Sequence, residues 1–288
     1  MQSNSILATA EKPKPRPPII TICGDAGVGK TTLAATFPNP IFIRAEDGME
    51  AIPQDIMPDA LPIITTVDQL WHQLRAIMFE EHNYKTLVID SVTALERLFI
   101  QHVMDSDQRR PTSIVRALGG YGAGPKAVAS MHQRVRRGAG ILNMEKQMNI
   151  VFLAHADTEQ FDPPDQDSYT RYCLRLAKGS MAPYVDDSDL VGFLKLKTYV
   201  KGAEDETRKK AISTGEIELV CYATAANISK NRYGITEDIA VPNGVNPLPP
   251  YIPAMSLEED AAPAAKPSKQ RATKNKTKTP AATEEAPQ

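Results

Sequence analysis

The sequence lacks the features that mark disulfide-rich, secreted and membrane-spanning proteins. It contains only three cysteines, which are scattered and odd in number, so neither a disulfide framework nor a zinc site is predicted from Cys23, Cys173 and Cys221. Residues 1–18 are polar and then proline-rich, without an apolar stretch long enough for a signal peptide or a membrane span. We therefore expect a cytoplasmic protein without a membrane partner, in which residues 1–17 form a flexible arm.

An excess of positive charge is also missing. The 33 Lys and Arg residues are balanced by 35 Asp and Glu residues, which leaves a formal net charge of −2. This balance excludes a globally basic coat for nucleic acid, but it allows a local basic groove. With 288 residues, of which 42% are hydrophobic, the chain is long enough to bury the core of one large α/β domain or of two small ones.

The most informative stretch is residues 21–33, Thr-Ile-Cys-Gly-Asp-Ala-Gly-Val-Gly-Lys-Thr-Thr-Leu. The apolar residues 19–23 begin it and the helix-forming residues 32–36 end it, which is the strand, loop and helix order that a phosphate-binding loop requires. The alternative is a glycine-rich turn with a chance Lys-Thr pair. The pattern G-x-x-x-x-G-K-[ST] is formed by Gly24, Gly29, Lys30 and Thr31.

A nucleotide would be held mainly by the backbone of this loop. Glycines allow positive φ values, so N–H groups can turn toward phosphate oxygens. We expect Lys30 to reach the β- and γ-phosphates and the Thr31 hydroxyl to bind Mg²⁺. The predicted cofactors are ATP and Mg²⁺, although no motif selects the base. The predicted nucleotide-binding residues are Gly24, Asp25, Ala26, Gly27, Val28, Gly29, Lys30, Thr31 and Thr32.

A second motif is the apolar run at residues 86–90, Thr-Leu-Val-Ile-Asp, which closes on an acid. Such a run is typical of a buried parallel strand that delivers a carboxylate to the carboxyl edge of a sheet. We interpret Asp90 as the Walker B acid, which holds Mg²⁺ through water. The alternative is that Asp90 only caps the helix predicted to begin at residues 91–98.

Hydrolysis also needs a group that orients or deprotonates the attacking water. No glutamate follows Asp90 directly, so this carboxylate must come from another strand. Glu46 follows the predicted strand 41–44, and strand order places it toward the γ-phosphate. The alternative is a solvated loop acid like Asp47 or Glu50.

Two stretches resemble the core of the RecA recombinases: Ile-Arg-Ala-Glu-Asp-Gly at residues 43–48, and Leu-Val-Ile-Asp-Ser-Val-Thr-Ala-Leu from residue 87. The run from the phosphate loop to this second stretch is similar to phage-encoded RecA-core ATPases that act as single-strand annealing proteins. The resemblance implies that Glu46 is the catalytic base. It also implies a three-layer α/β sandwich, a RecA-like P-loop core with a mainly parallel central sheet, over residues 18–253.

The resemblance extends to the end of the predicted strand 149–155. RecA-like proteins carry a polar switch residue there, usually glutamine, which senses the γ-phosphate and signals to a DNA-contacting loop. His155 departs from RecA but matches the phage group, and a histidine can hydrogen-bond a phosphate oxygen in either tautomer. An ordinary histidine at the edge of the core is the alternative.

Periodicity and capping signals predict most of the remaining elements. Thr66 and Gln69 form a capping box for a helix at 67–81, and a second helix is predicted at 127–146. Strands are predicted at 63–65, 189–200 and 216–223.

Two segments have the composition of loops that bind single-stranded DNA. Residues 109–124 are rich in glycine and cations, and residues 156–178 combine tyrosines with cations. Stacking on the rings and neutralisation of phosphates tolerate any base sequence. For the first segment the alternative is a solvated linker, and the acidic half of the second would repel phosphate. The candidate DNA-binding residues are Arg109, Arg110, Arg116, Tyr121, Lys126, Tyr169, Arg171 and Arg175.

Residues 229–234, Ser-Lys-Asn-Arg-Tyr-Gly, resemble an element of RadA-type and hexameric-helicase RecA folds. In those folds the cations of this element reach across a subunit interface to the γ-phosphate of the neighbour. The resemblance implies a homo-oligomer with ATP at subunit interfaces, and it makes Lys230 and Arg232 trans cations. The alternative is an exposed turn with two solvated cations.

Residues 254–288 are poor in apolar side chains and are predicted to be a disordered tail. Such a tail either docks on nucleic acid or on a single-strand DNA-binding protein, or only keeps the chain soluble. These features predict an ATPase, stimulated by single-stranded DNA, that promotes annealing or strand pairing in phage DNA recombination. The alternatives are a P-loop phosphotransferase for a small molecule and a non-hydrolysing, ATP-gated adaptor or loader for a replication protein.

Overall fold

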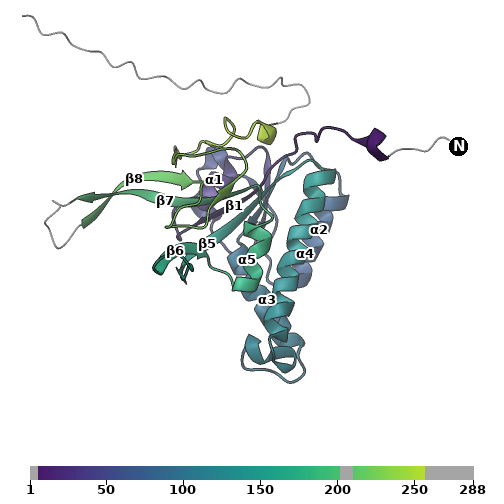
Figure 1. The fold of residues 1–288 in the computed structure, drawn as a ribbon. Helices are drawn as coiled ribbons and strands as arrows, with labels where there is room; N and C mark the ends of the chain where they lie inside the picture. Colours follow the sequence, from purple (N-terminus) through teal and green to yellow (C-terminus); the bar gives the residue numbers. More distant parts are fainter. Residues whose placement is uncertain (1–5, 202–209, 257–288) are drawn as a thin grey trace, which may run out of the picture.

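The centre of the molecule is a sheet with helices on both faces (Figure 1). The computed structural model describes residues 6–201 and 210–256. The strands are β1 (Ile19–Gly24), β2 (Pro40–Arg44), β3 (Asp59–Ala60), β4 (Thr86–Asp90), β5 (Asn149–Phe161), β6 (Tyr169–Leu174), β7 (Leu190–Lys201), β8 (Lys210–Val220), β9 (Lys230–Asn231) and β10 (Ile239–Ala240). The helices are α1 (Lys30–Ala35), α2 (Val67–Phe79), α3 (Val92–Ser106), α4 (Ala123–Glu145) and α5 (Lys178–Val185). The 3₁₀ helices are η1 (Ile6–Thr9), η2 (Met49–Ala51), η3 (Gln54–Ile56), η4 (Ile114–Gly119) and η5 (Pro253–Ser256).

The strand order of the sheet is β10-β8-β7-β1-β5-β4-β2-β3, with β6 beside β5 and β9 beside β7. The strands from β7 to β3 in this order run parallel, and the outer strands β8 and β10, together with β6 and β9, pair antiparallel. Every residue of β1 and β4 is buried, as expected for parallel strands that are covered on both faces. The predicted α/β class with a mainly parallel central sheet is confirmed.

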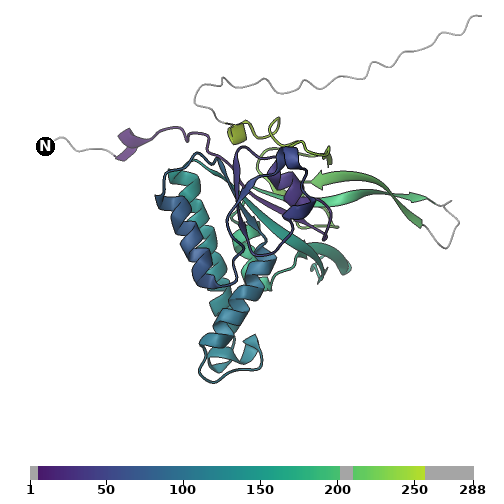
Figure 2. The ribbon, with the colours of Figure 1, turned by 180° about the vertical axis from the view of Figure 1, so that it is seen from behind.

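Each face of the sheet has its own hydrophobic core, because successive side chains of a strand point to opposite faces. Ile19 and Cys23 of β1 pack on the face that α2, α3, α4 and α5 cover. Ile20 and Ile22 pack on the other face, which is covered by the short helix α1 and by the chain at 248–255. Figures 1 and 2 show this three-layer arrangement from two sides.

Besides the β7–β8 hairpin, in which β7 continues past its last pair with β1 at Leu194, two segments project beyond the carboxyl edge of the parallel strands (Figure 1). Helix α3 leaves this edge directly after β4, and α4 returns the chain from a tip at residues 107–122 (Figures 1 and 2). The last pair between β1 and β5 joins Gly24 and His155. Strand β5 continues beyond this pair and forms a hairpin with β6. Both segments lie at the edge where the phosphate loop follows β1.

Several predicted elements differ from the structure. Residues 156–178, expected to be a loop, form most of the β5–β6 hairpin and the start of α5. The predicted strand 63–65 is not part of a ladder; β3 lies earlier, and Ile64 only donates one backbone hydrogen bond to Arg44, at 2.9 Å. Helix α4 starts before residue 127, and β8 starts before residue 216. The strands predicted at 19–23, 41–44 and 86–90 are confirmed.

The predicted disordered tail lies almost entirely outside the described residues, as do the first five residues of the predicted arm. The predicted domain boundaries therefore stay predictions. No helix in the described ranges is both long and apolar enough to cross a membrane.

Candidate nucleotide-binding site

The phosphate loop connects β1 to α1 with the backbone geometry that its glycines allow. Gly27 and Gly29 have φ values of 75° and 98°, in the region that favours glycine. Gly24 is required for a different reason: a Cβ atom there would lie 2.4 Å from the backbone oxygen of Leu194 in the neighbouring strand β7. The loop therefore needs glycine at three positions, two for its turn and one for the close approach of β7.

Lys30, the first residue of α1, folds back over this loop. Its side chain is buried, and its Nζ donates hydrogen bonds to the backbone oxygens of Gly24, at 3.0 Å, and Asp25, at 2.8 Å. Burial lowers the pKa of Lys30, and the nearby negative groups, among them Asp90 and Glu46, oppose this shift. An ammonium group that has only carbonyl partners is well suited to bind the phosphate oxygens of a ligand.

Asp90 lies beside the first turn of α1 and is 5% exposed. The Thr31 hydroxyl donates a hydrogen bond of 2.7 Å to its carboxylate, and burial raises the pKa of Asp90. Asp90 does not cap α3, because the Ser91 hydroxyl accepts the N–H of Ala94 in that role. Hydroxyl and carboxylate oxygens are ligands that suit Mg²⁺, which needs only one or two protein groups when a nucleotide supplies phosphate oxygens. The two side chains therefore fit a Mg²⁺–nucleotide complex.

Glu46 and His155 form a second polar pair at the same edge. The distance between His155 Nε2 and Glu46 Oε1 is 3.0 Å, and Arg97 Nη2 lies 3.6 Å from Glu46 Oε2. Hydrogen bonds from His155 and Ser91 and the charges of His155 and Arg97 lower the pKa of Glu46 to about 2, against the opposing effect of burial. Glu46 is therefore an ionised carboxylate, held in place rather than free in solvent.

The register of the sheet brings these groups together. Arg44, two residues before Glu46, pairs with Asp90, and Gly24 pairs with His155. Because β1, β5, β4 and β2 are neighbours, four groups lie at one edge of the sheet: Lys30, Asp90 and Glu46, which follow or end strands, and His155, which lies where β5 passes the end of β1. The charges of Asp90 and Glu46 both act on Lys30.

The family model for the AAA domain matches residues 16–233. The chain belongs to the AAA domain family. The match includes the phosphate loop, Glu46, Asp90 and His155, so these residues lie within an AAA-type P-loop domain. A search of curated proteins finds no significant match. Among solved structures, this AAA domain is similar to a RadB recombinase, with 10% sequence identity, a TM-score of 0.44, and coverage of 80% of this chain and 90% of that chain.

Two residues of α3 complete the site, and sequence reasoning missed them. The Thr93 hydroxyl accepts the backbone N–H of His155 at 3.0 Å, and Arg97 lies against Glu46. Their spacing of four residues places both on one face of α3, the helix that starts directly after Asp90. In the sequence, the four-residue spacing of Thr93 and Arg97 directly after Asp90 is the pattern that could have indicated these two residues.

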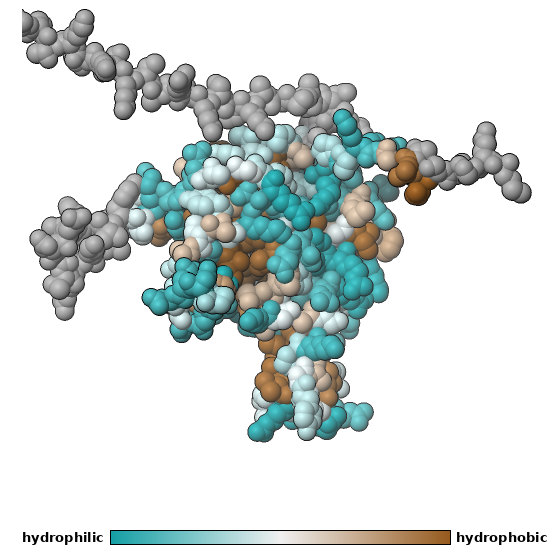
Figure 3. Space-filling model, viewed as in Figure 1, coloured by the Kyte–Doolittle hydropathy of each residue, from teal (hydrophilic) through white to brown (hydrophobic). Residues whose placement is uncertain are grey.

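The first DNA-binding candidates of the AAA domain lie at the tip between α3 and α4. Tyr121 is fully exposed, and the projecting tip carries both apolar and hydrophilic residues on its surface (Figure 3). The Asp107 carboxylate fixes the start of the tip by accepting the N–H groups of Arg109, at 3.0 Å, and Leu118, at 2.6 Å. All four candidate cations there have exposed side chains, and Arg109 Nε also lies 3.5 Å from Asp107 Oδ1; the four are Arg109, Arg110, Arg116 and Lys126.

The candidates in the β5–β6 hairpin already have partners within the chain. Arg171 Nη2 lies 2.7 Å from Glu159 Oε1, and its guanidinium lies 3.9 Å from the ring centre of Phe161. Arg175 donates to the backbone oxygen of Ala156 at 2.8 Å, and Tyr169 packs against Phe161. A DNA phosphate would therefore have to compete with these contacts.

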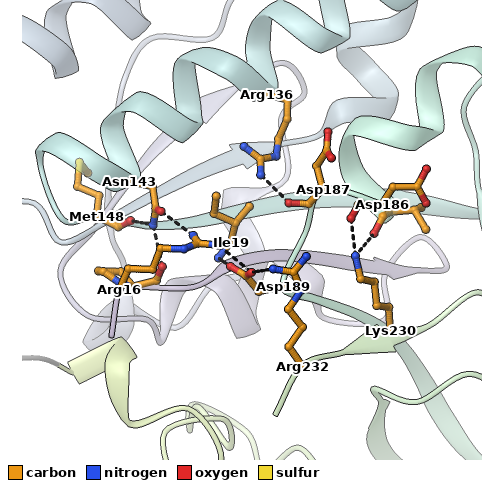
Figure 4. Close-up of polar contacts among 12 residues, drawn as sticks. Arg16, Ile19, Arg136, Asn143, Met148, Asp186, Asp187, Asp189, Lys230 and Arg232 are labelled. Atoms are coloured by element: carbon orange, nitrogen blue, oxygen red, sulfur yellow. Dashed lines mark hydrogen bonds and ion pairs between the residues drawn. The ribbon is translucent and has the colours of Figure 1, made fainter. Parts of the chain in front are cut away.

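Lys230 and Arg232 lie at the opposite edge of the sheet, where β9 pairs with the first residues of β7 (Figure 4). Lys230 donates to the backbone oxygens of Val185, at 3.3 Å, and Asp186. Arg232 Nη1 donates to Asp189 at 3.0 Å. A role toward a nucleotide thus requires a second subunit, and it stays a prediction.

Proposed function

We propose that this AAA domain is a Mg²⁺-dependent ATPase that binds single-stranded DNA and promotes annealing or strand pairing in phage DNA recombination. The observation that carries the proposal is the Glu46–His155 pair. It joins an ionised carboxylate, whose charge acts on Lys30, to the strand that continues into the β5–β6 hairpin. A phosphate binder without hydrolysis needs no such pair.

Each residue of the site has a different role in phosphoryl transfer. The loop at 24–32 holds the triphosphate, and Lys30 neutralises the charge of its oxygens. Thr31 and Asp90 would hold Mg²⁺, which when bound supplies positive charge for the developing negative charge of the reaction. With a pKa of about 2, Glu46 accepts a proton poorly, so it acts mainly by orienting the attacking water.

Two direct connections support coupling between nucleotide and DNA. Asp90 is followed by α3, which ends at the tip that exposes Tyr121, and His155 is followed by the β5–β6 hairpin. A shift of Asp90 or of His155 on ATP binding would therefore move an element that carries candidate DNA-binding residues. In this proposal the active form is a cytoplasmic homo-oligomer, with Lys230 and Arg232 at the neighbour's nucleotide and the tail available to a single-strand DNA-binding protein.

The test measures phosphate release with and without single-stranded DNA, in parallel with binding of a fluorescent ATP analogue. The native chain should release phosphate faster with DNA. Lys30→Ala should abolish nucleotide binding, because it removes the ammonium group of the loop. Glu46→Gln should bind the analogue normally but lose about 10²-fold or more of its turnover.

Glu50→Gln is the matched control, because it changes an exposed glutamate near the same strand. It should leave both binding and turnover unchanged. Normal turnover in Glu46→Gln would contradict the mechanism. ATP binding without phosphate release by the native chain would instead assign the protein to the adaptor class.

A further inference from the structure

Helices α2 and α4 lie side by side on the helical face and leave a groove between them (Figures 1 and 2). Two hollows, of about 670 and 600 Å³, lie along it. They are two parts of one groove, because both are lined by Trp71, Arg75, Met131 and Arg134. The groove is on a different part of the molecule from the nucleotide site.

The floor of the groove is apolar in the second hollow, whereas the first hollow is lined mostly by polar side chains. Trp71 stacks on the buried ring of Phe99, with 6.3 Å between ring centres and 12° between ring planes. The second hollow is lined by apolar side chains of both helices, and at its rim Phe79 is 78% exposed. Those side chains are Leu74, Met78, Ile141 and Leu142. An exposed apolar surface of this kind, rimmed by polar groups, marks an interaction site.

The rim of the groove is positively charged. Arg75, Arg134 and Arg137 line it, and none of the three has an ion pair with any residue in the described ranges. The Arg134 guanidinium lies 4.2 Å from the ring centre of Trp71, in a cation–π contact. Asp68, near one end, is the single acid among the described lining residues of the two hollows. The groove therefore combines an apolar floor with unpaired positive charge.

We propose that this groove docks an acidic amphipathic helix of a partner protein. Apolar side chains of such a helix would fill the floor, and its carboxylates would pair with the three arginines. The lining residues of α4 run from Ser130 to Leu142, a rise of about 18 Å, which corresponds to about three helical turns. A helix of that length offers enough anchor positions, at i, i+3, i+4 and i+7, for a stable complex.

Single-stranded nucleic acid fits this groove less well. A bound base needs an open aromatic face; the Arg134 guanidinium already lies over the Trp71 ring, which leaves the exposed Phe79 ring at the rim for stacking. The aliphatic side chains of the floor provide neither stacking faces nor hydrogen bonds for bases. The positive rim would attract nucleic acid and an acidic peptide alike. The two ligands are therefore distinguished by the apolar floor, which favours the peptide.

The experiment uses the fluorescence of Trp71, which is the only tryptophan of the chain. The full-length protein is titrated with a synthetic helical peptide of about 15 residues, which has leucines on one face, glutamates on the other and no aromatic residue. We expect a saturable change in Trp71 emission that weakens as salt is raised. A peptide with lysine in place of each glutamate should bind about fivefold more weakly or worse, because charge attraction becomes repulsion.

Gly138 allows a matched pair of variants, because a Cβ atom at this lining position would meet no other atom within 4 Å. Gly138→Met fills the second hollow and should abolish the saturable change. Gly138→Ala adds a single methyl group and raises helix propensity, so it should bind the peptide as the native chain does. Circular dichroism of both variants verifies that the fold is kept.

Three results would overturn the proposal. The first is no saturable change with the acidic peptide, or equal affinity for Gly138→Met and Gly138→Ala. The second is a change in Trp71 emission with oligothymidylate but not with the peptide, which would assign the groove to nucleic acid. The third is a lower sedimentation coefficient for Gly138→Met alone, which would assign the groove to a second copy of this chain.

Discussion

The two edges of the parallel sheet both bury charged side chains, but they satisfy them differently. At the carboxyl edge, Asp90 accepts a hydrogen bond from the hydroxyl of Thr31, and within the described residues Lys30 donates only to backbone oxygens. Burial shifts the pKa of both groups. At the amino edge, the buried carboxylate of Asp189 accepts three hydrogen bonds (Figure 4). The donors are the backbone N–H of Ile19, at 3.0 Å, and the guanidinium groups of Arg16, at 2.8 Å, and Arg232, at 3.0 Å.

This difference separates a binding site from a purely structural contact. We call the structural contact, which is Asp189 with its donors Ile19, Arg16 and Arg232, the joint. A buried charge with few partners costs folding free energy and becomes favourable when a ligand supplies the opposite charge. A buried carboxylate with three donors is already satisfied and holds together the segments that supply them. The carboxyl edge is therefore built for a ligand, and the amino edge joins the start of β1, the arm and β9.

The largest effect on stability is expected from Asp189→Ala. The change leaves the buried N–H of Ile19 without an acceptor and removes the ion pairs of Arg16 and Arg232. We expect the free energy of unfolding to fall by about 2–4 kcal/mol, as measured by urea denaturation without nucleotide.

Asp187→Ala is the control for this prediction. It removes an exposed carboxylate two residues away, while the backbone oxygen of Asp187 keeps its hydrogen bond from Arg136. Its effect should stay within about 0.5 kcal/mol. If the two variants were equally stable, Asp189 would not be the joint of the amino edge.

The same two edges show what the sequence could predict. At the carboxyl edge, the phosphate loop is one contiguous motif, and Asp90 ends a short apolar run, so local pattern was sufficient. At the amino edge, Asp189 is 170 residues from Ile19 and 173 from Arg16, and no local pattern marks such distant partners. The joint could therefore be found only in the folded chain.

The β5–β6 hairpin was missed for a similar reason. Its prolines and acids between residues 162 and 167 are typical of a loop, and they do form the turn. The strands on either side are held by cross-strand pairs, in which Arg171 contacts both Glu159 and Phe161, and Phe161 packs against Tyr169. Such pairs depend on register, which composition does not reveal.

A second prediction sharpens the comparison within the carboxyl edge, where two carboxyl groups have opposite pKa shifts. The pKa of Glu46 falls from 4.5 to about 2, so its ionised form stabilises the fold above pH 4.5, and this contribution is lost as the pH falls toward 2. The pKa of Asp90 is raised above 3.8, so its contribution is greatest at low pH and is lost as the pH rises through the raised pKa.

Isosteric amides separate the two contributions. In metal-free buffer near pH 7, Glu46→Gln should lower the free energy of unfolding by about 1–2 kcal/mol, because it removes a favourable charge. Asp90→Asn should raise it by about 1 kcal/mol, because the amide still accepts the Thr31 hydroxyl without the cost of a buried charge. Urea denaturation between pH 4 and pH 8 measures both, and shifts of the same sign would contradict the assignment.

The smallest effect on stability is expected from Arg232→Ala, which tests whether the amino edge also has a catalytic role in an oligomer. The Arg232 side chain is 58% exposed, and without it Asp189 keeps Arg16 and the N–H of Ile19, so the loss should stay below about 1 kcal/mol. Arg16→Ala is matched to it, because it removes the other ion pair of the same carboxylate.

If Arg232 acts on the nucleotide of a neighbouring subunit, only Arg232→Ala should reduce DNA-stimulated phosphate release, and both variants should remain folded. A mixture of Arg232→Ala and Lys30→Ala subunits should then recover part of the activity, because one supplies an intact phosphate loop and the other an intact arginine. Equal losses of activity in Arg16→Ala and Arg232→Ala, with no recovery on mixing, would mean that the arginine serves only the joint at Asp189. The two edges would then be independent, whereas recovery would show that the amino edge of one subunit completes the carboxyl edge of the next.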